Sequence, residues 1–319
     1  MASSLGGCAS LTKTQIQAVN HFAQVSQGFS QFPSKVMTGL ADIRADRGVF
    51  FANSLDNPRL HIQELDSIYS FKKGDYAISE KVDITFEIID KYAQSLLLLS
   101  SEKYGNNLHD KGLNFGADLD SLTSTYNSMS NVKKVPTSIG GAIGQLLALG
   151  GKQYVRSKQA REIKKFVPAA DELIAVMTDN LLEFLQTTNI KDLIKNEELG
   201  VNSNYLSYLR QAKTISSAVI KNDTTEFAFN TRSTVSNDHA YLNLKMRVDA
   251  VKSLRDETVV ATKALRKAHK KLLTAIQSRQ KLTALIPEVQ ELYGGIRKLK
   301  KSIAIIEKPK NNGYEGTER

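Results

Sequence analysis

The stretch LRDETVVATKALRKAHKKLLTAIQSRQKLTALI, residues 254 to 286, decides the fold class of this chain. Within this stretch, residues that would share one helix face recur at alternating steps of four and three positions. The members of this face are Leu254, Thr258, Ala261, Leu265, Ala268, Leu272, Ala275, Arg279, Leu282 and Ile286. This spacing is the seam of an α-helix that packs along another helix. The alanines on the seam predict that the two helices approach closely.

The same stepping occurs between Pro58 and Tyr104, at Ile78, Val82, Thr85, Ile89, Tyr92, Leu96 and Leu99. A second apolar face, formed by Ile84, Ile88 and Leu98, places this helix in the middle of a bundle. The chain has no Trp and only six Pro, and no turn-dense pattern of short strands occurs. The predicted fold is all-α, an elongated antiparallel bundle of long helices with coiled-coil-like packing, because the junctions are short.

The apolar pattern and its breaks give the expected boundaries. The predicted helices span 11–31, 34–54, 58–104, 113–132, 136–188 with a kink or join at Pro168, 189–200, 202–221, 238–286 and 287–306. A loop or a bent connection is predicted over 222–238. The domain division is an N-terminal segment at 1–11, a helical bundle domain at 12–307 and a disordered tail at 308–319, which lacks apolar periodicity.

The only cysteine, Cys8, stands in the run LGGCAS directly after Leu5, Gly6 and Gly7. An apolar residue and two small residues before a cysteine resemble the end of a bacterial lipoprotein signal. The charged and apolar parts of such a signal do not precede it, so residues 1–11 are interpreted as a truncated signal remnant and lipid-attachment segment. The alternative is that Cys8 is an ordinary residue of a cytoplasmic terminus.

The resemblance implies that Cys8 becomes the first residue of the mature protein, with diacylglycerol on its sulfur and an acyl chain on its amine. Several chains anchor a protein far more firmly than one, since each buried CH₂ contributes about 0.8 kcal/mol. Ala9 follows the cysteine, and in the lipoproteins that this run resembles the absence of Asp there is associated with the outer membrane. The implied location is the outer membrane of the bacterial envelope, facing the periplasm.

Seventeen residues without a charge, VPTSIGGAIGQLLALGG at 135–151, form a second unusual segment. Gly140 and Gly144 have the small-residue spacing that lets helices touch, and Gly141, Leu146, Leu147 and Leu149 complete the candidate set. One interpretation is a buried helix in close contact with a neighbour. The other is a membrane-inserting segment, in which case the architecture resembles that of α-helical pore-forming toxins.

Positive charge gathers near the C-terminus, where residues 245–301 contain fifteen Lys and Arg against five Asp and Glu. The candidate residues of an exposed basic stripe are Lys263, Arg266, Lys267, Lys270 and Lys271. Such a stripe is either a solvated helix face or a site for an anionic lipid, lipopolysaccharide or another anionic polymer. Tyr293 is the only aromatic residue within 245–301 that is available for base stacking, so specific nucleic-acid recognition is not expected.

No pattern of residues points to catalysis, a metal or a cofactor. The five histidines are scattered singly and each is expected at the surface or its boundary. The GGAIG run lacks the context of a phosphate-binding loop, and adjacent acids such as Glu197 and Glu198 point apart on a helix. The leading hypothesis is a lipid-anchored envelope lipoprotein with a structural or binding role and with a protein partner or a second copy of itself. The alternatives are a membrane-perturbing protein that inserts 135–151, and an anionic-polymer-binding protein.

Overall fold

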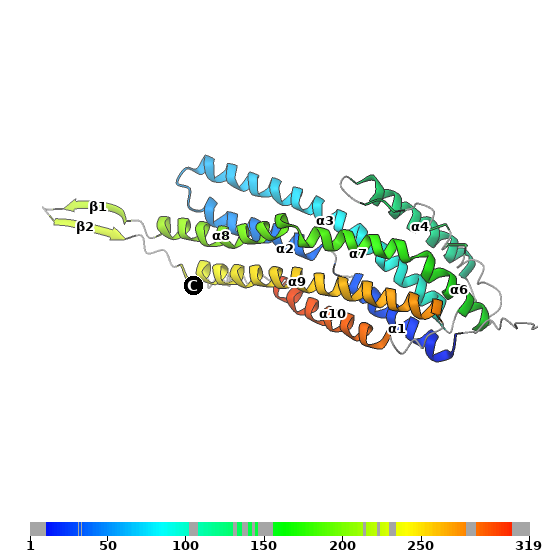
Figure 1. Ribbon diagram of the computed structural model, residues 1–319. Helices are drawn as coiled ribbons and strands as arrows, with labels where there is room; N and C mark the ends of the chain where they lie inside the picture. The colour runs from blue at the N-terminus through cyan, green and yellow to red at the C-terminus, as the bar shows by residue number, and fades with distance from the viewer. Residues whose placement is uncertain are drawn as a thin grey trace, which may run out of the picture. The chain divides into compact units, whose positions relative to one another are not determined.

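The computed structural model describes residues 11–30, 32, 34–101, 108–129, 133–135, 140–141, 144–145, 156–212, 215–221, 224–229, 234–278 and 285–307, some of them by their backbone alone. Long α-helices packed against one another make up nearly all of the described chain (Figure 1). The prediction of an all-α helical bundle is therefore confirmed, whereas coiled-coil-like packing remains a prediction. The chain divides into two compact units, each assembled from segments that are distant in sequence.

Unit 1 comprises Met1–Pro33, Glu80–Gln186 and Glu257–Leu299. Its helices are α1 (Lys13–Ser30), the second part of α3 (Pro58–Ser100), α4 (Leu108–Ser128), α6 (Arg156–Ala169), α7 (Asp171–Gln186), the second part of α9 (Val235–Ser278) and most of α10 (Ile286–Ile306). The seam residues of α9 that the structure describes in this unit are all buried, which confirms the burial that their spacing predicts.

Helix α3 lies in the middle of unit 1, as its second apolar face predicts. The ring of Tyr92 stacks on Phe166 of α6 with ring centroids 5.7 Å apart, and it meets Phe22 of α1 edge-on at 6.5 Å. Lys91 lies over the ring of Phe115 on α4. Because α3 is surrounded, most of its side chains beyond residue 84 are buried rather than those of a single stripe.

A buried histidine occupies the core of unit 1, against the expectation that every histidine lies at the surface or its boundary. His269 is 2% exposed and sits between two partners from other helices. Its Nδ1 is 2.7 Å from the Tyr92 hydroxyl, and its Nε2 is 3.1 Å from an oxygen of Asp171 at the start of α7. The Tyr92 hydroxyl and Nδ1 of His269 share a buried hydrogen bond, and burial raises the pKa of Tyr92. The expectation for His269 was wrong because both ring nitrogens have partners that the local pattern does not reveal.

Unit 2 comprises Ser34–Ser79, Thr187–Asp256 and Lys300–Arg319. It contains α2 (Lys35–Ala52), the first parts of α3 and α9, α8 (Thr188–Ala212), a two-stranded hairpin and the end of α10. Helices α2 and α3 are in close contact at Gly48, where an added Cβ would lie 2.7 Å from Cδ1 of Ile68. Glycine is thus what allows this close approach.

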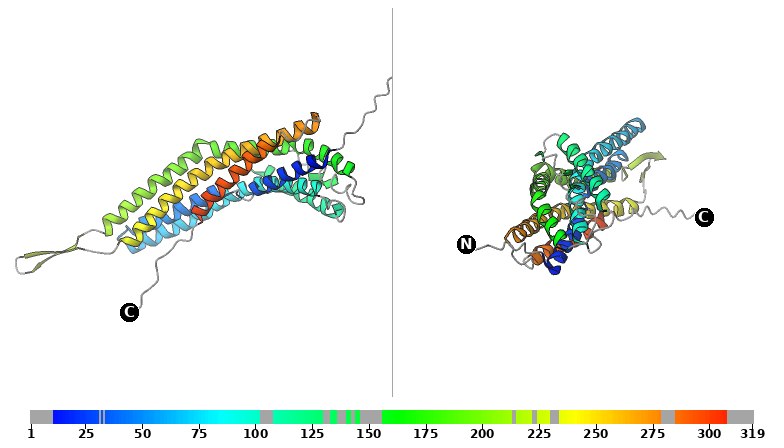
Figure 2. Two further views of the ribbon diagram at one scale, coloured as in Figure 1. Left: turned by 90° about the horizontal axis from the view of Figure 1, so that it is seen from below. Right: turned by 90° about the vertical axis from the view of Figure 1, so that its right-hand side faces the viewer.

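The hairpin joins β1 (Ile215–Lys221) to β2 (Thr224–Phe229) in antiparallel register, with an irregularity between Ile215 and Ser217. It leads from the end of α8 to the start of α9 (Figure 2). The prediction of helix up to Lys221 was therefore wrong, and the loop or bent connection predicted from Asn222 contains the strand β2. β-branched residues are frequent in both strands, and they favour a strand where no helical seam competes.

An aromatic cluster holds the helices at the base of this hairpin. Tyr205 on α8 stacks on Tyr241 of α9 with ring centroids 4.4 Å apart, and Phe50 of α2 meets Tyr205 edge-on at 5.0 Å. The Tyr205 hydroxyl donates a hydrogen bond to Asp238. Burial is the main cause that raises the pKa of Tyr205, and this hydrogen bond raises it further. The cluster therefore fixes the end of α8 against the start of α9.

Contacts give the relative direction of the helices. Helices α2 and α3 are antiparallel, because Asp42 contacts Lys72 whereas Gly48 contacts Ile68. Helices α8 and α9 are also antiparallel, because Asn202 contacts Tyr241 whereas Tyr208 contacts Asn237. Helices α2 and α8 instead run in the same direction, since Arg47 contacts Glu197 and Phe50 contacts Tyr205. Parallel packing of these two is compatible with short junctions because they are not consecutive in the chain.

Most other boundaries of the described helices agree with expectation to within a few residues, with two differences, in α8 and α4. Helix α8 continues through Gly200 to Ala212, whereas a helix end was predicted at this glycine. Pro168 lies next to a join between two helices, α6 and α7, rather than at a kink in one continuous helix. Helix α4 begins at Leu108 rather than Leu113. Among the described helices, none combines the length and the apolar character needed to cross a bilayer.

The Asp171 to His269 contact makes a prediction about acid stability. The hydrogen bond from His269 lowers the pKa of Asp171 below its ordinary value of 3.8, so this stabilisation is present above that pH and is lost as the pH falls through the folded pKa. We expect Asp171→Asn to lower the free energy of unfolding by about 1 kcal/mol at neutral pH, a small value because the carboxylate is half exposed to screening water. Urea unfolding at several pH values measures this.

Glu172→Gln is the matched control, since Glu172 is the next residue in the same first turn of α7 and is exposed. It removes the same charge from the start of the helix without touching His269. An Asp171→Asn variant that matched Glu172→Gln at every pH would contradict the assignment.

Candidate functional site

A surface cleft of about 480 Å³ lies within unit 2, between α2, α3 and α8. Its lining combines charged or amide side chains with apolar ones: Arg44, Arg47, Glu64, Asn196, Glu197 and Asn204, and Gly48, Phe51, Ile68, Phe71 and Leu193. Volumes of roughly 300 to 1,000 Å³ are typical of small-molecule sites. This combination of size and lining makes the cleft the candidate binding site.

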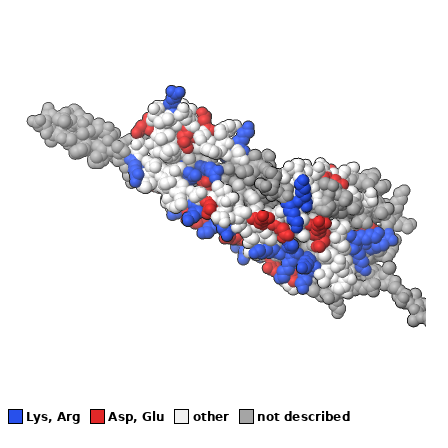
Figure 3. Space-filling view, turned by 45° about the horizontal axis from the view of Figure 1, so that its top comes forward, with Lys and Arg blue, Asp and Glu red and all other residues white. Residues whose placement is uncertain are grey.

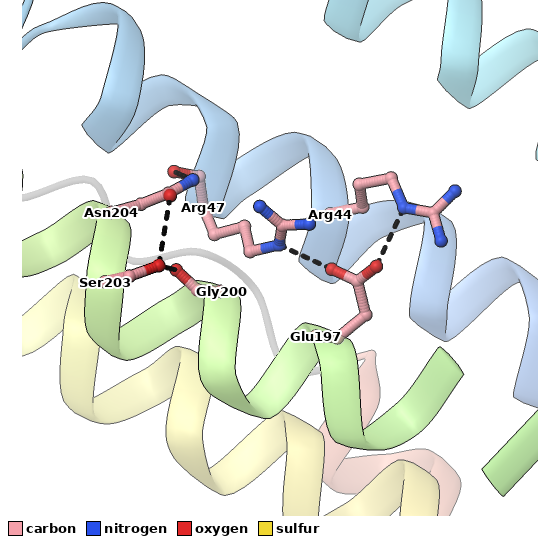
Figure 4. Close-up of polar contacts among 6 residues, drawn as sticks. All are labelled: Arg44, Arg47, Glu197, Gly200, Ser203 and Asn204. Atoms are coloured by element: carbon pink, nitrogen blue, oxygen red, sulfur yellow. Dashed lines mark hydrogen bonds and ion pairs between the residues drawn. The ribbon is translucent and has the colours of Figure 1, made fainter. Parts of the chain in front are cut away.

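Glu197 is the buried centre of the cleft, with a side chain that is only 2% exposed. Its Oε1 accepts a hydrogen bond from Nε of Arg44 at 2.8 Å, and its Oε2 accepts one from Nε of Arg47 at 2.5 Å (Figure 4). A buried carboxylate without such partners would carry a large desolvation penalty. The two arginines therefore stabilise the charge of Glu197, and Glu197 in turn fixes the position of both.

Helical spacing brings these groups together. Arg44 and Arg47 are three residues apart and lie on one face of α2, and Glu197, Gly200 and Asn204 follow one face of α8. The Asn204 side chain donates a hydrogen bond to the carbonyl oxygen of Arg47 at 3.1 Å. The next residue along, Glu198, is exposed, as expected for adjacent acids on a helix.

Gly200 provides the surface on which Arg47 lies. A Cβ added there would be 2.6 Å from Cζ and from Nε of Arg47, too close for the present position of the side chain. The absence of a side chain at Gly200 therefore allows the guanidinium of Arg47 to pass over α8 and reach Glu197. This explains a glycine in the interior of a helix, where it is otherwise destabilising.

The apolar part of the cleft comes mainly from α2 and α3, with Leu193 added by α8. Ile68 packs against Gly48, while Phe51 is 37% and Phe71 is 61% exposed. Exposed large apolar residues continue along this part of α3 at Leu60, Ile62, Leu65 and Tyr69. These side chains leave apolar surface exposed on α2 and α3 beside the charged groups of the cleft.

The described lining offers two guanidinium groups, two carboxylates and two side-chain amides that can bind and orient a ligand. Within the described ranges, no group of three or more His, Cys, Asp or Glu is arranged to hold a metal ion. Two guanidinium groups and an apolar wall are instead suited to an anionic group attached to an apolar one.

Sequence reasoning did not identify this cleft. Arg44 and Arg47 stand three residues apart in IRADRG, which is a visible signal on a helix whose neighbours are buried. Glu197 carries no local signal, because its burial depends on α2 packing against α8. The residues therefore come together only through the tertiary structure.

The glycine-rich segment lies in unit 1, and part of it is described. Gly140 donates its backbone N–H to Oδ1 of Asp120 at 2.7 Å. A Cβ added at Gly116 of α4 would lie 2.5 Å from the carbonyl oxygen of Gly140 and 2.8 Å from Cα of Gly144. Gly141 is partly exposed next to Asp120. Leu146, Leu147 and Leu149 fall outside the described residues, and membrane insertion of the segment remains a prediction.

The basic stripe lies on α9 in unit 1, with Lys263, Lys267, Lys270 and Lys271 exposed. Part of its charge is paired: Arg266 contacts Asp179, and Lys267 is 3.3 Å from Glu291 of α10. On the face drawn in Figure 3, acidic side chains lie among the basic ones. Binding of an anionic polymer by the stripe remains a prediction. Cys8 and the tail at 308–319 lie outside the described residues.

The ion pairs of Glu197 make a prediction about stability. Glu197→Gln keeps the shape of the side chain but removes its charge and one acceptor, so we expect the free energy of unfolding to fall by about 2 kcal/mol. The arginines are 22% and 26% exposed and can be rehydrated, which limits the loss. Urea unfolding measures it, and Glu198→Gln is the matched control, expected to change stability by less than about 0.5 kcal/mol. Equal stability of the two variants would refute this account.

The contact at Gly116 makes a second prediction. Gly116→Ala places a methyl group against the backbone of Gly140 and Gly144, which cannot move away as a side chain end can. We expect it to lower the free energy of unfolding by about 1 to 3 kcal/mol. Gly294→Ala, on α10 in the same unit with nothing within 4 Å, is the control and should leave stability unchanged or raise it. Thermal unfolding of both variants that gave the same midpoint would contradict the close contact.

Comparison with known proteins gives no match: no protein-family model, no curated protein and no solved structure matches the chain. The resemblance to bacterial lipoproteins therefore rests on Leu5, Gly6, Gly7 and Cys8 alone.

Proposed function

We propose that the chain is a lipid-anchored helical-bundle protein of the bacterial envelope with a binding role and no catalysis. The observation that carries the binding role is the cleft of unit 2, where Arg44 and Arg47 are fixed by the buried Glu197 beside exposed Phe51 and Phe71. A rigid set of charged groups next to an exposed apolar surface is a property of binding sites.

The burial of charged side chains at the cleft supports a binding role over a purely structural one. A buried ion pair between helices is often no more stabilising than apolar packing would be. Here three ionised side chains are held at the wall of a cleft, and two of them are about one quarter exposed. Such an arrangement is useful where an ionised group must meet a ligand in a fixed orientation.

The anchor is supported by the run LGGCAS, in which Cys8 is the only cysteine of the chain. Its thiol is the one group near the N-terminus that can form a thioether with diacylglycerol. An anchored bundle exposes its surface along the membrane at a high local concentration, which suits a protein that binds a component of the envelope.

Lipidation can be tested directly by expressing the native gene, with its upstream sequence, in a Gram-negative bacterium. We expect the N-terminal peptide from the membrane fraction to begin at Cys8 and to carry the mass of a diacylglyceryl group and an acyl chain. Cys8→Ala should release the protein from the membrane fraction, whereas Ser10→Ala, two residues on, should not. An unmodified peptide that begins at Met1 on a cytoplasmic protein would overturn the anchor.

A further inference from the structure

We propose that the cleft of unit 2 binds an anionic amphiphile, a single carboxylate or phosphate head group on a hydrocarbon chain. The head group would bind the guanidinium of Arg47 and the hydrocarbon would lie on Phe51, Ile68 and Phe71. The inference deepens the binding role proposed above and rests on it, because it names the chemistry of the ligand.

Arg47 is a preorganised receptor for an oxyanion. Its Nε–H is engaged by Oε2 of Glu197 at 2.5 Å, and its stem lies on Gly200. Among the described residues, Glu197 is the only hydrogen-bond acceptor of this guanidinium. The side chain is 22% exposed and lines the cleft, so its terminal N–H groups can donate to a ligand without a change of rotamer.

The charges of the cleft are separated along its length. At one end, Glu197 accepts one hydrogen bond from each of the two guanidinium groups and holds both in place. Glu64, the second carboxylate of the lining, lies on α3 one turn before Ile68. Helices α2 and α3 are antiparallel, and Ile68 of α3 contacts Gly48 of α2. Glu64 therefore lies beside the part of α2 that follows Gly48. Arg44 and Arg47 lie on the part of α2 that precedes Gly48. An anionic head group is therefore attracted to the arginine end and repelled from the other.

The apolar lining accounts for the rest of the ligand. Phe71 is level with the arginine end of α2 and Phe51 lies beyond Gly48, so apolar surface follows the cleft past the charged groups. Phe51 and Phe71 are 37% and 61% exposed, and covering them with hydrocarbon removes apolar surface from water. The cleft volume of about 480 Å³ suits a small molecule rather than a helix, which needs a longer groove.

Isothermal titration calorimetry with five probes tests the inference on the whole chain. Decanoate and decyl phosphate supply the two head groups, decanol supplies the chain without a charge, and acetate and inorganic phosphate supply the charge without a chain. We expect both charged amphiphiles, below their micellar concentrations, to bind at one site roughly tenfold or more tighter than decanol. Acetate and phosphate should show no measurable binding. The charged amphiphile that binds more tightly identifies the head group that the cleft prefers.

Two variants test the role of Arg47. Arg47→Gln removes the charge, and Gly200→Ala keeps every charge but displaces the guanidinium, since the new Cβ would lie 2.6 Å from its Cζ. Both should weaken decanoate binding roughly tenfold and leave decanol binding unchanged. Gly200→Ala also keeps the test valid if Arg47→Gln fails to fold, because alanine favours the helix.

Two control variants should bind decanoate as the unaltered chain does. Ser203→Ala removes a side-chain group on α8 one turn from Gly200, and Lys35→Gln removes a positive charge of unit 2 outside the cleft. Equal affinities for decanoate and decanol would overturn the inference. So would unchanged decanoate binding by folded Gly200→Ala, or loss of binding in Lys35→Gln to the same extent, which would indicate attraction by net charge alone.

Failure of the inference and failure of the binding role give different results. The chain has no Trp, so Phe51→Trp provides a single fluorescent reporter in the cleft. A reporter that responds to a total envelope extract but to none of the amphiphiles would overturn the inference and leave the binding role intact. A reporter that responds to neither would overturn both.

Discussion

The carboxylate of Glu197 imposes the constraint on which unit 2 depends. Once α8 packs against α2, this group leaves water almost completely, and only ion pairs with hydrogen-bond geometry stabilise it in that position. Arg44 and Arg47 satisfy both oxygens, one nitrogen each. The direction and register of α8 along α2 are thereby fixed, since a shift of one turn would leave the carboxylate buried without a partner. The parallel arrangement of the two helices, the position of Gly200 and the cleft itself follow from this register.

Close helix approach at small residues is the second theme, and both units use it. Gly48 meets Ile68 in unit 2, while in unit 1 Gly295 meets Ala261, which is a member of the seam on α9. Where such residues replace larger ones, backbones approach and many weak dispersion contacts form over a short length of helix. In unit 2 the same device also leaves space, because Gly200 has no side chain to compete with Arg47.

The sequence predicts the parts of this structure that depend on local periodicity. The seam of α9 and the second face of α3 indicate long buried helices, and the structure contains them, because a period of three and four residues determines which side of a helix faces the core. It does not predict features that depend on a distant partner. Gly200 reads locally as a helix end, yet α8 continues because packing on α2 outweighs the propensity of one residue.

The same distinction explains the missed histidine and the missed cleft. The burial of His269 requires Tyr92 and Asp171, which come from two other helices, and nothing in its own neighbourhood indicates them. The cleft requires residues from α2, α3 and α8, and the contacts between α2 and α8 join positions 150 to 157 apart in the chain. The strands Ile215–Lys221 and Thr224–Phe229 were missed for another reason, since a short run of apolar and polar residues fits the end of a helix almost as well as a hairpin.

The aromatic cluster at the base of the hairpin has a consequence for how the chain can change during evolution. Tyr205 and Tyr241 join α8 to α9 by direct stacking, and Tyr205 also reaches Asp238 near the first turn of α9. The reversal of the chain is therefore closed by side chains of the helices and does not depend on the segment that connects them. Such a junction tolerates a connection of different length or sequence, because the entropy of closing a loop rises only slowly with its length. The hairpin is accordingly the place where this fold can acquire, exchange or lose a recognition element while the bundle remains intact.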